Sequence, residues 1–561
     1  MNFTSLWTRA RPGRRAAFAA MLGAVVSMGG AAASPAASPP KRAASQVLNV
    51  NLAIIPIMDP TQWGTSASYT IQDNLFVRLT AVDPKTHKVM PSLATSWSSS
   101  KDFKTWTFQL RRDAKFADGK PITSADVRYT LVRNYTVLNA DQMKALGATN
   151  SFPQGFISLP EIQGGIAASR GQAPAIASTA ITAPTKYSVR LRLDVGRNDV
   201  PQRLAFPVWG IVQAANVATS EAGNPWWYHA VGSGPYRLAS FSAGQSLSLT
   251  PNPHWWGPKP ILKRVNFIVG TNTQTAEIAY QSGSLDFVKI PYSDVNNLKG
   301  SGYQTQLRGY SDNAVSVILV NANAATANPN VVKALTLALD KRTLANRVLE
   351  GLPRPALTFT PPQWPGYSAK GYKPLTFDAS AAKAAFERSG LDPSRVTIRM
   401  AYTGSQDPRA AQAIAQMWQQ TLGVTVRVVP SAAAPPANAP ESQALNVLLQ
   451  AQGPTFIAPC SMVQRIKDIL ITGAGANNVN TKPSNAIESR LDRALEECYA
   501  AAPDKVWSKV MEIETMNQVN QVFIPVLWNI DYFIVKPYVR GLKLGPTWNI
   551  ANLTKVWIAQ H

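Results

Sequence analysis

Hydrophobic and polar positions alternate clearly in residues 106–127, which read WTFQLRRDAKFADGKPITSADV. Trp106 to Leu110 places an apolar residue at every second position, a period that predicts a half-buried strand. The dipeptide Asp118-Gly119 is typical of a tight turn. Thr123, with Asp126 three positions later, resembles a helix capping box. This segment therefore predicts a strand, a turn and a helix in that order.

The second half of the chain shows a β-α-β pattern. Alternating apolar residues predict strands near 396–402 and 424–428, and a helical period fills 409–422 up to Gly423. Such a unit implies a parallel strand pair joined by a right-handed crossover. A buried first strand is predicted over 48–55, and further helices over 331–349, 485–500 and 503–520.

Six segments occur in an order that resembles one protein family. They are WTFQLRRDAKFADGKPITSADV at 106–127, PSLATSW at 91–97, GSGPYRL at 232–238, NPHWWG at 252–257, VKALTLALD at 332–340 and IPVLWNIDY at 524–532. Together they resemble the family 5 extracellular solute-binding proteins, the peptide, nickel and opine receptors of ABC importers. The resemblance covers roughly residues 48 to 558.

The resemblance implies an α/β fold of the periplasmic binding protein type II, or Venus-flytrap, class. Two α/β lobes would be joined by hinge strands, with an extra small domain. The expected divisions are a signal peptide at 1–33, a linker at 34–46, the first lobe at 47–83, 204–320 and 526–561, the extra domain at 84–203, and the second lobe at 321–525. The implied function is capture of a peptide or other polar small molecule and its delivery to the permease and ATPase of an ABC importer, with the receptor acting as a monomer.

The N-terminus predicts export. Four arginines precede an apolar run at 16–28 and small residues up to Ala33, the pattern of a secretory signal. The run is too short for a permanent membrane span, and no cysteine follows it for lipid attachment. The pair Arg14-Arg15 leaves the twin-arginine route open beside ordinary export. We therefore expect a periplasmic protein that is not lipid-anchored and meets the membrane only through a permease.

The formal charge of +23 does not by itself indicate nucleic-acid binding. Loss of the four signal arginines leaves about +19, and the remaining basic residues are scattered without a run of five. No nucleic-acid-binding motif accompanies the charge. A solvated basic surface, or a preference for anionic solutes, remains open.

Motifs for catalysis and cofactor binding are absent from the sequence. It contains no GxSxG, HExxH, Walker loop or dinucleotide-binding glycine pattern, and its four histidines are widely spaced. We therefore expect no cofactor, no metal site and no enzyme activity. Two alternatives stay open: a secreted hydrolase, whose triad would be spatial, and an extracytoplasmic sensor or assembly partner.

The only two cysteines are Cys460 and Cys498. In an oxidising compartment a lone pair favours a disulfide, and two separately buried thiols are the alternative. No CxxC motif supports zinc or dithiol redox chemistry.

Aromatic and polar residues near the expected lobe junctions are the candidate ligand contacts, because binding clefts combine apolar walls with a few polar groups. Two follow the first strand, one precedes a hinge strand expected over 314–321, one lies in a proline-rich loop, and two lie at the return crossing. These residues are Trp63, Tyr69, Tyr310, Trp364, Trp528 and Asn529.

The loop LLQAQGPTFIAP at 448–459 departs from the family pattern. Peptide-binding members typically carry an aspartate there that holds the ligand's α-ammonium group. This loop contains Gln450, Gln452 and the aromatic Phe456, but no acid. Glutamine both donates and accepts hydrogen bonds, so the loop favours a neutral polar or anionic solute, such as a sugar, a blocked peptide or an opine-like compound.

Overall fold

The computed structural model describes residues 40–561 except 53–55, 63–65, 84–85, 87, 149–154, 160, 170–171, 174, 270–272, 291, 301, 321–327, 365, 404–405, 432–446, 454–457, 463, 466–484, 502–503, 521–522 and 544–552. Its contacts separate Met1–Lys41 from Arg42–His561, and all that follows concerns the second unit. The predicted signal peptide lies outside the described residues. The divisions expected within 47–561 remain predictions.

The first-lobe sheet is built around β1 (Val47–Leu52), which pairs in parallel with β10 (Arg264–Val269) and β11 (Phe287–Ile290). Antiparallel strands β9 (Ser246–Pro251) and β8 (Tyr236–Ser242) extend its edge. Every second residue of β1 is buried, as expected for a strand inside a lobe. The helices that accompany this sheet are α1 (Ser66–Leu75), α8 (Thr273–Gln281) and α9 (Tyr292–Lys299).

The four-stranded sheet contains the strand predicted within residues 106–127. Its order is β4 (Ala94–Ser99), β5 (Thr105–Leu110), β7 (Ser188–Arg192) and β6 (Ile181–Thr185). The predicted turn and helix are confirmed: Gly119 has a left-handed φ of 88°, and α2 (Ser124–Arg133) begins where Asp126 accepts a hydrogen bond from the Thr123 backbone N–H at 2.8 Å. We use the name four-stranded domain for this sheet and the helices around it, from β4 to residue 203.

Shorter elements surround these two sheets. They are β2 (Thr80–Val82), β3 (Val89–Pro91), α3 (Ala140–Leu146), α4 (Gly155–Ser158), α5 (Gly165–Ser169), α6 (Val200–Arg203), η1 (Pro207–Trp209), α7 (Ala214–Val217), η2 (Trp226–His229), η3 (Gln304–Gln306), β18 (Val539–Arg540), η7 (Leu553–Lys555) and β19 (Trp557–Ile558).

The second-lobe sheet confirms the predicted β-α-β unit. Strand β14 (Thr397–Thr403) pairs in parallel with both β15 (Thr425–Ser431) and β16 (Val447–Gln452). Helix α13 (Pro408–Leu422) connects the first two and ends at Gly423, whose φ of 75° is left-handed. Further elements of this lobe are α10 (Pro329–Leu337), α11 (Lys341–Thr343), the π-turn η5 (Leu344–Val348), β13 (Arg354–Pro355), α12 (Ala379–Glu387), η6 (Pro393–Arg395), α16 (Asn485–Ala500) and α17 (Val506–Asn520).

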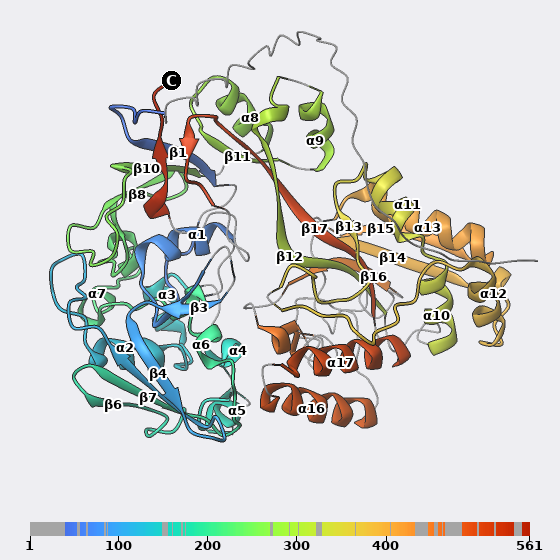
Figure 1. The fold of residues 1–561 in the computed structure, drawn as a ribbon, viewed down its shortest axis with the longest axis horizontal. Coiled ribbons are helices and arrows are strands. Elements are labelled where there is room, and N and C mark those ends of the chain that lie inside the picture. The colour runs from blue at the N-terminus through green and yellow to red at the C-terminus, as the bar shows by residue number, and fades with distance from the viewer. Residues whose placement is uncertain are drawn as a thin grey trace, which may run out of the picture. The chain divides into compact units, whose positions relative to one another are not determined.

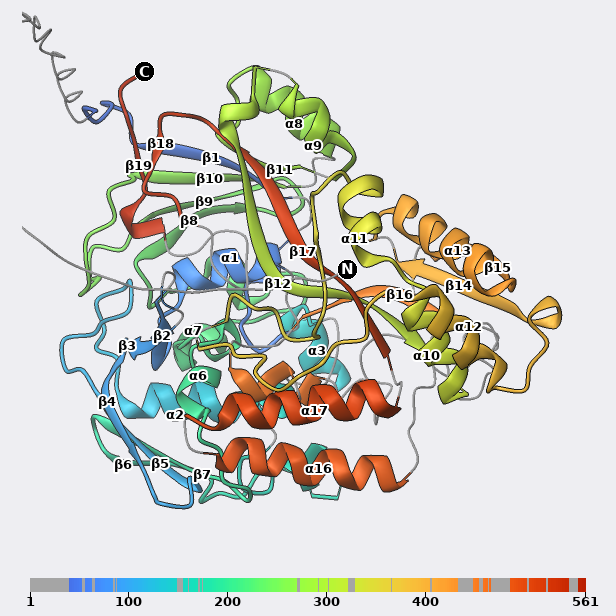
Figure 2. The same cartoon turned by 45° about the vertical axis from the view of Figure 1, so that its right-hand side comes forward.

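Two hydrophobic cores cover opposite faces of the second-lobe sheet. Helices α10, α12 and α13 pack on the face that presents Val447 and Leu449. Helices α16 and α17 pack on the face that presents Leu448. Figures 1 and 2 show α16 and α17 lying next to each other as a pair.

The helix predicted over 331–349 is wrong as a single element. It is interrupted at Leu339–Asp340, because the Asp340 side chain accepts hydrogen bonds from the backbone N–H groups of Arg342 and Thr343 and so begins a new turn. Aspartate at such a position competes with continued helix.

Two long antiparallel strands connect the sheets of the two lobes. Strand β12 (Leu307–Val320) lies beside β17 (Phe523–Val535) along most of its length (Figures 1 and 2). At one end β17 pairs with β11 of the first lobe, and at the other β12 pairs with β16 of the second. The hinge strand expected from residue 314 thus begins at 307, and Tyr310 lies within it rather than before it.

Candidate functional site

The parallel strands of both lobes indicate where a ligand would bind. In open α/β sheets, ligands bind beyond the carboxyl ends of the parallel strands. In the first lobe these ends include Leu52 of β1, and in the second they include Thr403 of β14 and Gln452 of β16. The crossing strands run past the Gln452 end, because Gln452 pairs with Val315 of β12 and Val315 pairs with Trp528 of β17.

Four of the candidate residues belong to one face of the second-lobe sheet. Side chains alternate along a strand, so Gln450 and Gln452 share the face of Leu448. Trp364 and Trp528 pack in the hydrophobic core that contains Leu448. The loop expected over 448–459 is wrong for its first part, because Gln450 and Gln452 lie in β16, whose pairing with β12 extends to Gln452. The structure brings them to the same face as Trp364 and Trp528.

The polar groups of this face differ in whether they have hydrogen-bond partners. Gln452 Oε1 accepts a hydrogen bond from Arg465 Nε at 2.9 Å, and Trp528 Nε1 donates to the Thr358 carbonyl at 3.0 Å. Gln450 is only 3% exposed, and its Nε2 has no hydrogen-bond partner among the described residues. A buried donor without a partner costs free energy, so this amide is a candidate to donate to a ligand.

The other candidates lie elsewhere or outside the described residues. Asn529 Oδ1 accepts from Ser316 Oγ at 2.8 Å, and its side chain alternates to the other face from Trp528. Tyr310 pairs in register with Asp531 and packs partly against the first-lobe core. Tyr69 is 2% exposed on α1, with its ring 5.2 Å from that of Phe206. Trp63 and Phe456 fall outside the described residues.

A buried ion pair follows the carboxyl end of β1, and sequence reasoning missed it. Asp59 Oδ2 lies 2.5 Å from Arg133 Nη2 and also accepts from Trp226 Nε1 at 3.2 Å. Burial alone would raise the pKa of Asp59, but the charge and hydrogen bonds of Arg133 outweigh it, so this pKa lies below its ordinary value. An acid in the loop after a predicted buried strand was the available signal. Its partners on α2 and η2 come from distant segments.

Gln62 lies in the same loop and resembles Gln450 in its environment. It is 2% exposed, and its Oε1 has no hydrogen-bond partner in the described part of the chain. Each lobe thus offers at least one buried, unsatisfied amide group at or near the carboxyl edge of its sheet.

Buried carboxylates among the described residues are all engaged. Asp59, Glu161 and Asp199 accept hydrogen bonds from arginines, Glu514 from backbone N–H groups, and Asp286 from Tyr538 Oη and the Asn49 backbone. Asp531, on the crossing strand, lies 2.8 Å from Lys289 Nζ. Each buried acid in the described ranges therefore already accepts at least one hydrogen bond from another part of the protein.

Cys460 and Cys498 form a disulfide with Cα atoms 5.9 Å apart. The bond ties the segment that follows β16 to helix α16, which bears Cys498. It therefore restrains the chain directly after the stretch 448–459, which departs from the family pattern.

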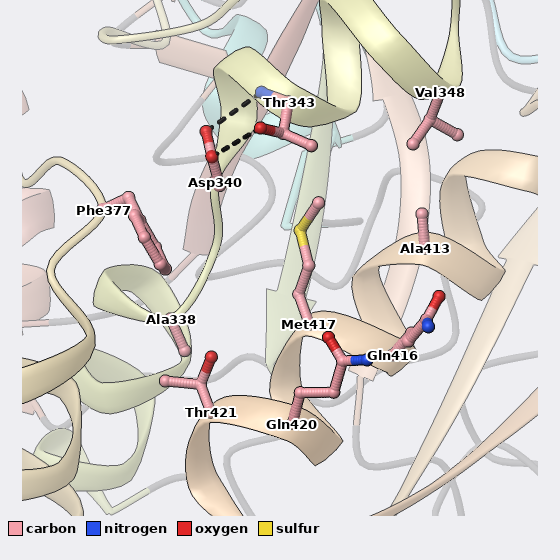
Figure 3. A pocket seen from close by; sticks show the side chains of 10 residues that line it. All are labelled: Ala338, Asp340, Thr343, Val348, Phe377, Ala413, Gln416, Met417, Gln420 and Thr421. Atoms are coloured by element: carbon pink, nitrogen blue, oxygen red, sulfur yellow. Dashed lines mark hydrogen bonds between the residues drawn. The ribbon is translucent and has the colours of Figure 1, made fainter.

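A separate pocket of about 310 Å³ lies on the other helical layer of the second lobe (Figure 3). Its lining includes Met417 of α13, Asp340 before α11 and Phe377 before α12. The Asp340 carboxylate already accepts hydrogen bonds from the backbone N–H and the hydroxyl of Thr343 (Figure 3). None of the candidate ligand contacts lines this pocket.

Comparison with known proteins decides the family. The model of the bacterial extracellular solute-binding proteins, family 5, matches residues 88–468. The chain belongs to this family. Its predicted class, a solute-binding receptor of an ABC importer with a two-lobed α/β fold, is confirmed at that level.

Relatives of this family 5 protein cover most of its length. It is 24% identical to the periplasmic murein peptide-binding protein MppA of Escherichia coli K12 over 84% of the chain and 86% of that protein. It is 24% identical to the periplasmic oligopeptide-binding protein OppA of Salmonella typhimurium over 90% of the chain and 91% of that protein. It is 27% identical to the nickel-binding periplasmic protein of Escherichia coli K12 over 54% of the chain and 53% of that protein.

Solved structures share the fold of this family 5 protein. The unliganded open form of MppA superposes with a TM-score of 0.73 at 22% identity, covering 93% of the chain and 99% of that structure. Haemophilus influenzae OppA in complex with RPPGFSPFR gives 0.70 at 20% identity, covering 93% and 100%.

The described residues contain no group of three or more acidic, histidine or cysteine side chains that could hold a metal ion. Within the same ranges, no helix has the length and apolar character needed to cross a membrane. No observation on the described residues favours the hydrolase or sensor alternatives.

Proposed function

We propose that this protein captures a polar solute without a free ammonium group between the carboxyl edges of its two lobe sheets. The solute would contact Gln450 and Gln452, beside Trp364 and Trp528, and then be delivered to the permease and ATPase of an ABC importer. The observation that carries the proposal is the buried Gln450 amide without a partner, in a lobe whose buried carboxylate, Glu514, is already satisfied.

A ligand with a free ammonium group would have to be buried as a cation. An ammonium group that leaves water without a counter-charge loses several kcal/mol. A neutral amide, hydroxyl or carboxylate oxygen can instead accept from Gln450 Nε2. The related proteins named for murein peptide, oligopeptide and nickel show that members of this family differ in ligand, so the solute class depends on such local groups.

Native mass spectrometry of the protein purified from its own periplasm tests this proposal. The mass difference between the intact and denatured protein weighs the retained solute, and an amine-reactive reagent then reports whether that solute carries a primary amine. We expect a discrete solute that does not react. A retained solute that gains the label would overturn the proposal.

If the purified protein is empty, thermal-shift measurements with N-acetyl-trialanine and trialanine compare a blocked with a free amino terminus. A larger shift with the blocked peptide supports the proposal. A larger shift with the free peptide contradicts it.

The variant Gln450→Leu separates binding from folding. We expect it to lose the retained solute while its free energy of unfolding stays within about 1 kcal/mol of the wild type, because Nε2 has no partner to lose. Gln416→Leu is the matched control: Gln416 is exposed on α13 of the same lobe and lines the pocket of Figure 3. It should retain the solute.

The same proposal includes export by residues 1–33, release without a lipid anchor, and function as a monomer. The arginine-led apolar run and the absence of a following cysteine support the first two. The mass of the exported protein and its light scattering in solution test all three.

A further inference from the structure

The four-stranded domain contacts the second lobe at a buried side chain, Tyr499 of α16. Tyr499 is 0% exposed, and its hydroxyl accepts a hydrogen bond from Arg203 Nη2 at 2.7 Å. Its ring lies under the Arg197 guanidinium, with Cζ 3.8 Å from the ring centroid. Two arginines from one domain therefore contact a single tyrosine of the other.

The arginines are held in place by acids of their own domain. Arg203 Nε lies 3.0 Å from Asp199 Oδ1, and Arg197 Nη2 lies 2.5 Å from Glu161 Oε1. Burial alone would raise the pKa of Glu161, but the charges of Arg203 and Arg197 outweigh it and hold this pKa below its ordinary value. The two cations and two anions balance, so the domain presents an ordered, neutral cluster to Tyr499.

A second contact between the same two domains lies beside the first. Asn198 Nδ2 donates to the carbonyl of Ala501 at 3.2 Å, just beyond the end of α16. The four-stranded domain thus contacts the C-terminal end of α16 through Asn198, the residue next to Arg197.

Tyr499 is also connected to the candidate solute site. Its neighbour Cys498 is bonded to Cys460, and the Cys460 carbonyl lies 3.5 Å from the Tyr499 hydroxyl. Five residues after Cys460, Arg465 donates to Gln452. A continuous path of covalent and hydrogen bonds therefore joins the arginine cluster to the end of β16.

The contact is suited to reversible formation. Arg197 Nε and Nη1 and Asp199 Oδ2 are buried without hydrogen-bond partners among the described residues. Such groups lose hydration when the domains meet and regain it when they part. The favourable contacts of Tyr499 are thus partly offset, which leaves a modest net preference for the joined state.

We propose that Tyr499 is a positioning residue for solute capture: by contacting Arg197 and Arg203 it couples contact between the four-stranded domain and the second lobe to the segment that follows β16. The role in capture rests on the proposed function. The coupling between domains does not, and can be measured without any solute.

Hydrogen exchange of the ligand-free protein, followed by mass spectrometry, tests the coupling. Tyr499→Phe removes the hydroxyl but keeps the ring under Arg197. Loss of a buried hydrogen bond to a charged group should accelerate exchange on the order of tenfold. We expect that acceleration on both sides of the contact, at residues 194–205 of the four-stranded domain and 495–501 of the second lobe.

Tyr372→Phe is the matched control. Tyr372 Oη donates to Gln518 Oε1 at 3.0 Å, and both residues belong to the second lobe. Its loss should accelerate exchange near 370–378 and 514–520 and leave 194–205 unchanged. If Tyr499→Phe likewise leaves 194–205 at the wild-type rate, Tyr499 is a structural residue of one lobe only and the proposal fails.

Asn198→Ala keeps the test decisive if Tyr499→Phe does not fold. It removes only the hydrogen bond from the half-buried Asn198 side chain to Ala501, and we expect a few-fold faster exchange at 495–501. An unchanged rate there would contradict the coupling.

The half-life of the retained solute, measured by native mass spectrometry after dilution, then tests the role in capture. Tyr499→Phe should shorten it by a factor on the order of ten, whereas Tyr372→Phe should not. Exchange that changes as expected in a protein whose retained solute carries a primary amine would leave the coupling standing and reject the proposed function.

Discussion

Lys341 is a cation that the second lobe buries almost completely. Its Nζ donates to the Ala356 carbonyl at 2.9 Å. Burial lowers the pKa of Lys341 to about 8, although the nearby charge of Glu514 partly opposes this shift. Between pH 8 and 10.5 the unfolded chain therefore binds a proton that the folded protein lacks, so the Lys341 contribution to stability rises with pH through that window.

We expect the difference in unfolding free energy between wild type and Lys341→Met to change by about 3 kcal/mol in favour of the wild type from pH 7 to pH 10.5. Urea unfolding of both proteins across this range measures it. Groups other than Lys341 titrate in both proteins and cancel in the difference. A pH-independent difference would show that Lys341 has an ordinary pKa.

The disulfide closes a loop with a sequence separation of 38. In the loop-entropy model, its removal in a Cys460→Ala/Cys498→Ala double variant should lower the free energy of unfolding by roughly 3 to 4 kcal/mol. Urea unfolding checks this. Wild type measured with a thiol reductant should show a similar loss, whereas the double variant should not respond to the reductant.

Single residues could be assigned from the sequence only where local pattern decides them. The capping pair Thr123 and Asp126 was assigned in this way and is confirmed. Gln450 and Gln452 were not: they were expected in a loop but lie in β16, where side-chain alternation puts both on one face. The partners of Asp59 and Asn529 could not be inferred, because Arg133, Trp226 and Ser316 lie far away in the chain.

Helix α12 shows how one capping side chain contributes at the scale of an element. Asp378 Oδ1 accepts from the Ala381 backbone N–H at 2.9 Å, satisfying a donor that the first turn leaves free. Asp378→Ala should therefore lower the free energy of unfolding by about 1 kcal/mol. Asp378→Asn retains an acceptor and should remain near wild type in the same urea titration. Equal losses in both variants would indicate a role for the charge rather than for the cap.

Elements with a clear period were predicted well, and those set by tertiary pairing were not. The β-α-β unit of β14, α13 and β15 followed from alternation and a terminal glycine. The length of β12 did not, because its pairing with β17 shifts register between Ser311 and Val315 and again after Ser316. Such irregular pairing interrupts the alternation by which a strand is recognised.

At the scale of the whole molecule, the order of strands depends on segments that are distant in sequence. Strands β12 and β17 pair with each other and join the sheets of both lobes, although about two hundred residues separate them in the chain. No periodicity encodes that pairing. Hinge strands that join the lobes were expected only because six motifs in order resembled a known family, and the match of the family model over residues 88–468 confirms that family.

The ion pair of Asp59 and Arg133 joins three distant parts of the molecule: the loop after β1, helix α2 and, through Trp226, the turn η2. Asp59 is fully buried, and removing one partner of a buried pair leaves the other charge unmatched. We expect Asp59→Asn to lower the free energy of unfolding by about 3 to 5 kcal/mol at pH 7.

Acid should reproduce this loss in the wild type. The pKa of Asp59 lies below its ordinary value, so its contribution is present above that ordinary value and disappears as pH falls through the folded pKa. The wild type and Asp59→Asn should therefore converge in stability toward low pH. Asp113→Asn is the matched control, because Asp113 pairs with Arg111 but is 62% exposed, and its loss should cost at most about 1 kcal/mol. Equal losses in the two variants at pH 7 would show that the pair in the interior contributes no more than one at the surface, and that the three segments are held together by apolar packing alone.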